Sequence, residues 1–226
     1  TEAHWEFDSE KLQRLRFIRK VYATLLVQLS LTCAVCALCM YVDSVRNYVI
    51  NNIGLMIFGV IMSFVMLIVL FCVRDKYPIN LVCLIIWTII EAYTVGVICG
   101  MYASVGYQDV VIQAFVLTIV LFLALTIFTI QSKWDFSFLG FGLFACLWIL
   151  IIWGIINLIF GFQLIWLYSL FGAIVFSLFI IFDTWFMLKR SDVSSEGDWI
   201  LAAINLYLDV INLFLFLLQL LASSRN

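Results

Sequence analysis

The longest stretch without a charged side chain runs for 47 residues, from Phe136 to Phe182. A helix needs about 20 apolar residues to cross the hydrocarbon of a bilayer, so this run is too long for one span and suits two. Only 12% of the chain is charged and 66% is apolar, whereas an average soluble domain has about 25% and 45–50%. Such a chain cannot cover a soluble globule with polar groups, which excludes a soluble fold. A net charge of −2 gives no field for capturing nucleic acid.

The charge-free stretches predict an all-α integral membrane protein with seven spans. The Gly161–Gln163 segment divides the long run in two, and Pro78 stands where a first helical turn tolerates proline. No stretch shows the alternating pattern of a membrane β-strand. The predicted spans are about 18–41, 53–73, 79–101, 110–130, 138–160, 164–188 and 199–221. The alternative is six spans plus a re-entrant C-terminal segment, because four polar side chains interrupt the last span: Asn205, Asp209, Asn212 and Gln219.

Lysine and arginine in the loops predict the orientation. With seven spans, ten of the 12 basic residues fall on the side of the N-terminus, which favours a cytosolic N-terminus. Residues 1–17 fit either a short interfacial helix or a solvated basic flank. The first apolar stretch lacks a clear signal-peptide cleavage site. Because Thr1 is not a natural start, we expect an initiator Met or a longer N-terminus to be missing.

The residues that seven-helix zinc hydrolases and retinal proteins need are missing from the predicted spans. The seven cysteines lie within or at the ends of spans, and the only histidine, His4, lies in the N-terminal segment, so a zinc site lacks partners. The cysteines are therefore predicted to be packing residues and not disulfides. No span holds a central lysine for a retinal Schiff base, and no phosphate loop or catalytic triad stands out. We expect no enzymatic activity and no cofactor.

Three acids within the spans carry the functional hypothesis. Of 14 carboxylates, 11 lie in loops or the N-terminal segment, and the others are Glu91, Asp183 and Asp209. A carboxylate in a bilayer costs several kcal/mol unless it is paired, protonated or hydrated. A neutral acid that joins helices is the structural alternative. All three lie between the predicted cytosolic ends and the midplane, at about 9 Å for Asp183, 15 Å for Asp209 and 18 Å for Glu91.

The last two spans are predicted to bring two of these acids together. A short loop joins them, so they are expected to be antiparallel neighbours with Asp183 facing Asp209. On the last span Asn205, Asp209 and Asn212, with Gln219, form one polar stripe that we expect to turn inward. Two close carboxyl groups in low dielectric share a proton and titrate as a pair, which makes a pH sensor. When deprotonated, the same oxygens suit Ca²⁺, which points to a proton-tuned cation pathway.

Several motifs give the chain a family resemblance. Arg19–Tyr22, Tyr77–Leu81, Gln113–Thr118, Gln131–Phe136, Phe182–Thr184 and Ala202–Phe214 resemble the transmembrane Bax inhibitor motif (lifeguard) family. The context of Glu91, Ile90–Val95, is most similar to its Golgi anti-apoptotic protein branch. The resemblance covers about Arg16 to Leu221, and its most specific parts are Asp183–Thr184 and Asn205–Asn212.

The resemblance implies a seven-helix bundle with the last helix at its centre. It implies a cation leak, mainly of Ca²⁺, from intracellular stores and protection from cell death. Asp183 and Asp209 match the family's pH-sensing pair, and Arg74 or Lys76 is the candidate for a cytosolic latch to that pair.

The leading interpretation is a pH-regulated Ca²⁺-permeable channel of Golgi and endoplasmic reticulum membranes that lowers store Ca²⁺ and inhibits apoptosis. Glu91, Asn205 and Asn212 are predicted on its ion pathway, with transient Ca²⁺ at the three acids. The expected partners are the lipid bilayer, Ca²⁺, protons, other membrane or apoptosis-regulating proteins, and further copies of the chain. The alternatives are an anti-apoptotic scaffold that acts by binding proteins and a proton-coupled Ca²⁺ exchanger.

Overall fold

The chain is described by a computed structural model over residues 2–161, 164–189 and 198–225, with the backbone alone for 2–11. Within these ranges all regular secondary structure is α-helical. The helices are α1 (Glu2–Tyr41), α2 (Asp43–Asn51), α3 (Ile53–Val73), α4 (Ile79–Ser104), α5 (Gln108–Gln131), α6 (Leu139–Phe160), α7 (Ile165–Lys189) and α8 (Asp198–Ser223). Seven of these described helices are long and apolar enough to cross a membrane, so the predicted fold class is confirmed.

The helices from α3 to α8 begin and end within three residues of the predicted spans. Gly161 ends α6 in a left-handed conformation, with φ of 64°, which an L side chain rarely adopts. The rest of the predicted break, residues 162 and 163, lies outside the described residues. Pro78 directly precedes α4, where its missing N–H removes no helical hydrogen bond.

The first helix is longer than its predicted span. α1 has 40 residues, and its apolar part begins at Leu12. At 1.5 Å per residue it is about 60 Å long, twice the thickness of a hydrocarbon core. The N-terminal segment is thus helical and continuous with the first span, while its place at a membrane interface stays a prediction.

The short helix α2 has no counterpart among the predicted elements. Its nine residues follow α1 after a single residue, and Val49 is buried against Cys39 of α1 and Val97 of α4. Arg46 donates to the Met40 carbonyl (2.8 Å) and pairs with Asp43. α2 is not predictable from the sequence, because its few apolar residues are separated by polar ones and are too few to form a span.

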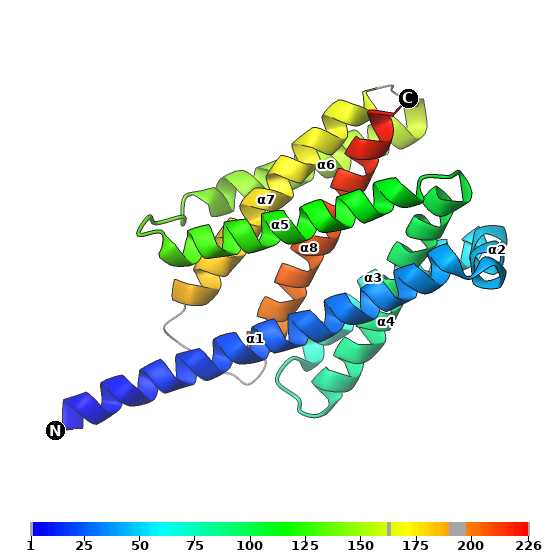
Figure 1. The fold of residues 1–226 in the computed structure, drawn as a ribbon. Helices are drawn as coiled ribbons and strands as arrows, with labels where there is room; N and C mark the ends of the chain where they lie inside the picture. The colour runs from blue at the N-terminus through cyan, green and yellow to red at the C-terminus, as the bar shows by residue number, and fades with distance from the viewer. Residues whose placement is uncertain (1, 162–163, 190–197, 226) are drawn as a thin grey trace. The chain divides into compact units, whose positions relative to one another are not determined.

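The first of two compact units contains α1 to α4 and the beginning of α8, up to Tyr207. In this unit α1 runs alongside α4 (Figure 1). The close approach depends on Gly96, because a Cβ there would lie 3.0 Å from Val35 Cγ1 and 3.1 Å from Cys39 Sγ. Small residues let helices in membranes pack closely in this way. All seven cysteines are described, and each is a free thiol in the structure.

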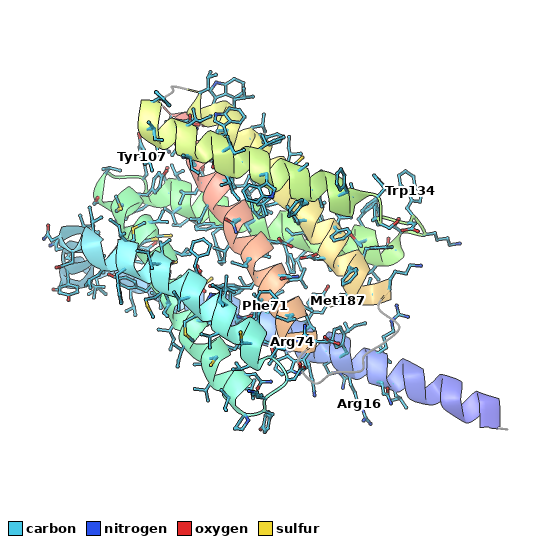
Figure 2. The ribbon with its side chains drawn as sticks, turned by 180° about the vertical axis from the view of Figure 1, so that it is seen from behind. Arg16, Phe71, Arg74, Tyr107, Trp134 and Met187 are labelled. Carbon is cyan, nitrogen blue, oxygen red and sulfur yellow. The ribbon has the colours of Figure 1, made fainter. Side chains whose placement is uncertain are left out.

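The second unit contains α5, α6, α7 and the rest of α8, from Leu208. α7 packs against both α5 and α6 (Figure 1). Tyr107, just before α5, and Trp134, just after it, lie at opposite ends of this unit (Figure 2). At the Tyr107 end, Arg225 donates to Asp109 of α5 (Nη1–Oδ1 2.8 Å) and joins the end of α8 to the start of α5.

α8 is the most buried of the seven long helices. In its most apolar stretch 61% of the residues are buried, compared with 11–44% in the other six. It is also continuous over 26 residues. Both observations support a full span over the re-entrant alternative.

Candidate functional site

The structure brings Asp183 of α7 and Asp209 of α8 together within the second unit. Their side chains are close enough to share a hydrogen bond. Asp209 is only 5% exposed, and Asp183 is half-buried. The expected antiparallel pairing of the last two spans therefore places these two acids face to face.

The chemistry of this pair follows from its setting. Two carboxylate anions have no proton to share and repel each other, so a hydrogen bond between two carboxyl groups requires a proton on one of them. Such a pair gains and loses protons as one coupled group. On an apolar helix inside a bilayer, the shared proton removes one of the two charges that would otherwise cost several kcal/mol each.

Polar atoms without partners cluster in sequence around the acid pair. Among the described residues, Asp209 Oδ2, Thr184 Oγ1 and Trp185 Nε1 are buried without a hydrogen-bond partner. Native structures satisfy the great majority of buried polar atoms, often with ordered water. This part of α7 and α8 therefore offers hydrogen-bonding capacity that water or a cation can use. Asn212, one turn beyond Asp209, donates to the Leu208 carbonyl (2.8 Å).

Glu91 lies in the first unit and is held differently. Ser63 of α3 donates to Glu91 Oε1, and the indole Nε1 of Trp87 donates to Ser63 Oγ (3.0 Å). Because Trp87 occupies a lone pair of the Ser63 oxygen, the hydroxyl proton points towards the carboxyl group. Glu91 thus has a fixed neutral donor, and its described hydrogen bonds remain within its own unit.

The polar stripe of the last span is not buried along its whole length, because Asn205 is exposed. Near its start α8 buries the opposite face, with Ala203, Ile204 and Tyr207 inside. Asp209 is buried and Asn212 half-buried. The spacing of these residues predicts that they share one face of the helix. It does not show which face of α8 is buried at each position along the helix.

A hydrogen-bonded cluster in the first unit was missed. The ring of Tyr207 packs edge-on against Trp87, with centroids 5.4 Å apart. Its hydroxyl lies 2.8 Å from Thr32 Oγ1, and Thr32 donates its own proton to the Gln28 carbonyl (2.9 Å), so Tyr207 is the donor. Gln28 Nε2 also donates to Thr88 Oγ1 (3.0 Å). The available signal was Gln28, an amide side chain in the middle of the first span.

The two latch candidates lie around the end of α3, where Figure 2 labels Arg74. Arg74 Nε pairs with Asp75 Oδ2 at 3.2 Å, and both Arg74 and Lys76 are exposed. A latch from either residue to the aspartates stays a prediction.

With this geometry the chain can be placed among known proteins. Residues 14–226 match the family described as inhibitor of apoptosis-promoting Bax1. The chain belongs to this Bax inhibitor family. The family match spans all the membrane helices and both aspartates, so the resemblance deduced from the motifs is confirmed.

Three relatives illustrate how broadly this family is distributed. The chain is 43% identical to the Golgi anti-apoptotic protein of vaccinia virus (strain Lister) over 214 residues, which cover 94% of this chain and 87% of that protein. It is 38% identical to protein lifeguard 4 of Mus musculus over 216 residues, with coverages of 94% and 87%. It is 35% identical to a BI1-like protein of Arabidopsis thaliana over 222 residues, with coverages of 96% and 84%. The family description and the name of the viral relative support apoptosis inhibition, and neither names an enzyme.

Proposed function

We propose that this protein is a pH-regulated, Ca²⁺-permeable leak channel that lowers store Ca²⁺ and thereby inhibits apoptosis. The observation that carries the proposal is the buried Asp183–Asp209 pair on α7 and α8. α8 is also the most buried long helix. Family membership supplies the biological role, apoptosis inhibition.

The pair regulates the path through its proton. With the proton in place, the two carboxyl groups bind each other and hold α7 against α8. Loss of the proton leaves two anions that repel each other and present up to four oxygens, which are the ligands that Ca²⁺ prefers. Asp209 Oδ2 and Thr184 Oγ1 have no hydrogen-bond partner among the described residues, so water or the ion can bind to them. Asn212 continues the path along α8.

We place the protein in Golgi or endoplasmic reticulum membranes with its N-terminus in the cytosol. The name of the vaccinia relative supports the compartment. The ten-to-two distribution of basic residues supports the orientation. In this orientation the pair lies nearer the cytosolic end of α7, and Arg74 or Lys76, just after α3, is the residue that we propose as a latch.

Reconstitution tests the proposal directly. The purified protein is placed in vesicles loaded with Ca²⁺, and efflux is followed with an external Ca²⁺ dye from pH 5 to pH 8. We expect wild-type efflux that depends on pH, and efflux from Asp183→Asn and Asp209→Asn that no longer responds to pH. Asp135→Asn, an exposed acid in the loop after α5, is the matched control and should behave as wild type. Absence of leak at every pH, or Asn variants identical to wild type, would contradict the proposal.

A second candidate is an anti-apoptotic scaffold, which the relatives' names fit equally well. In a scaffold the aspartate pair acts only as a neutral contact between α7 and α8. The double Asn variant separates the candidates, since a variant that folds, protects cells and conducts nothing favours the scaffold. A proton-coupled exchanger would acidify the vesicle interior as Ca²⁺ leaves, which a pH dye inside the same vesicles measures.

A further inference from the structure

Beyond the acid pair, α7 and α8 meet through an aromatic layer. Phe216 of α8 stacks on Phe176 of α7, with centroids 5.7 Å apart and ring planes at 23°. The Tyr168 ring packs edge-on against the Phe216 ring, with centroids 5.4 Å apart. A Cβ at Gly172 would lie 2.4 Å from the nearest carbon of the Phe216 ring, so the ring occupies the space that any side chain at position 172 would need.

A polar contact follows on the far side of this layer. Ser169 Oγ donates to Gln219 Oε1 at 2.7 Å and also lies 2.8 Å from the Ile165 carbonyl. Ser169 is fully buried. A hydroxyl has one proton, so the two acceptors compete for it, and three oxygens converge at one place. Such oxygens are suitable ligands for a hard cation.

The register of the two helices puts the three contacts in order. From Asp209 to Phe216 is seven residues of α8, a rise of about 10 Å, and Gln219 is about 4.5 Å further. On α7 the same order runs backwards through Asp183, Gly172 and Ser169, because the helices are antiparallel. One helix pair thus carries oxygens at two levels and an apolar ring between them.

We propose that Phe216, seated on Gly172, is the gate that closes the ion path between the Asp183–Asp209 pair and the Ser169–Gln219 contact. This inference rests on the proposed leak function and deepens it. A Ca²⁺ ion needs six to eight oxygen ligands, and the layer formed by Phe216, Phe176 and Tyr168 presents mainly carbon. Apolar constrictions stop ions by excluding water. Closure requires glycine at position 172, because any larger residue would occupy the space of the Phe216 ring.

The position of the ring also explains how the acid pair opens the path. Asp209 and Phe216 are two turns apart on the same helix, so a shift of α8 against α7 when the pair loses its proton moves both. Phe216 contacts the rings of Phe176 and Tyr168 and fills the space beside Gly172, and a small sliding or rotation of α8 against α7 changes these contacts. Gating therefore requires no separate hinge within α8, which is continuous from Asp198 to Ser223.

The test is Ca²⁺ efflux from vesicles that contain Phe216→Ala. We expect efflux about tenfold faster than wild type at the pH where wild type is slowest, because a smaller side chain lets water enter the layer. Phe214→Ala is the matched control, since Phe214 is a buried phenylalanine of the same helix. It should leave efflux near the wild-type rate. Phe216→Leu, which keeps an apolar side chain of similar size, should largely retain closure.

A second variant keeps the test valid if Phe216→Ala folds poorly. Gly172→Ala places a methyl group where the ring lies, so it should displace Phe216 and raise efflux while the aromatic side chain is retained. In the double variant Gly172→Ala/Phe216→Ala the methyl group at position 172 has room. Efflux from this double variant should therefore equal efflux from Phe216→Ala alone, without an additive increase. Strictly additive effects would contradict the contact as the gate.

The outcomes separate the gate from the function on which it rests. If Asp209→Asn changes efflux but Phe216→Ala and Gly172→Ala both match wild type, the gate is wrong and the leak function stands. If neither wild type nor Phe216→Ala conducts at any pH, both fail. If wild type is silent at every pH and Phe216→Ala conducts, the leak function of the wild-type protein is contradicted and Phe216 is supported only as a barrier to ions.

Discussion

The two units treat a buried acid in opposite ways. In the first unit Glu91 accepts a hydrogen bond from Ser63, whose orientation Trp87 fixes. In the second unit Asp209 has the Asp183 side chain as its hydrogen-bonding neighbour, and within the described residues its Oδ2 has no partner. An acid with a neutral, fixed donor can serve as a structural contact, whereas two acids that depend on one proton respond to pH. The immediate partners of a membrane acid therefore indicate its role better than its depth does.

The largest expected effect contrasts Asp209→Asn with Glu91→Gln in Ca²⁺ efflux. Asparagine cannot take up or release the proton of the pair, so the wild-type response to pH, about tenfold or more, should fall below about twofold. Glutamine retains an oxygen that accepts from Ser63, so Glu91→Gln should keep the response. A flat profile for Glu91→Gln with a normal one for Asp209→Asn would move the sensor to the first unit.

The next effect concerns stability and compares two hydroxyl groups. Ser63→Ala leaves both Trp87 Nε1 and Glu91 Oε1 without their partner, which should cost about 1–3 kcal/mol. Thr184→Val removes a hydroxyl whose oxygen has no partner and keeps the side-chain shape, so it should change stability by less than about 1 kcal/mol. Thermal unfolding in detergent, followed with a thiol-reactive dye that reports exposure of the cysteines, measures both variants. A loss for Ser63→Ala as small as that expected for Thr184→Val would contradict a structural role of the Ser63 contact.

A smaller effect is expected for Tyr207, which donates to Thr32. Tyr207→Phe should lower stability by about 0.6 kcal/mol, the average value for a hydrogen bond between membrane helices. Tyr93→Phe is the matched control, because the Tyr93 hydroxyl is buried without a partner in the described structure. It should be neutral or slightly stabilising in the same unfolding assay. A loss at Tyr93 as large as that at Tyr207 would show that the Thr32 contact contributes nothing.

Much of this fold follows from charge placement alone. α3 begins and ends at the predicted residues, Ile53 and Val73, because asparagines and Arg74 bound an uninterrupted apolar run. α2 could not be predicted, since its stability comes from packing Val49 against two other helices and not from its own sequence. The sequence does not show that the N-terminal segment and the first span form one long helix. Charged residues mark where an apolar span begins, but they do not prevent a helix from continuing.

The acid pair could be predicted, whereas its surroundings could not. Two acids at similar depth in adjacent antiparallel spans have few other polar partners. The short loop between the last two spans and the depth of each acid therefore predicted the pairing of Asp183 with Asp209. The role of Ser63 beside Glu91 depends on how α3 packs against α4, and the contact of Phe216 with Gly172 depends on the register of α7 and α8. A serine, a phenylalanine or a glycine in an apolar span carries no sign of such a partner. Three-dimensional placement alone reveals them.

The smallest expected effect concerns Asp135, an acid in the loop after α5, and tests whether an acid outside the membrane contributes to the pH response. The Ser137 backbone N–H donates to Asp135 Oδ1 at 2.9 Å and lowers the pKa of Asp135 below its ordinary value. A lowered pKa in the folded state means that the contribution of Asp135 to stability is present above its unfolded pKa of about 4 and is lost as the pH falls through the folded pKa. Asp135→Asn should therefore lower the unfolding temperature slightly at pH 7 and not at all at strongly acidic pH. Because Asp135 keeps its charge between pH 6 and pH 8, this variant should leave the pH profile of Ca²⁺ efflux unchanged. A shifted profile would place the sensor in the loop after α5, and an unshifted one leaves the pH response to the acids inside the membrane.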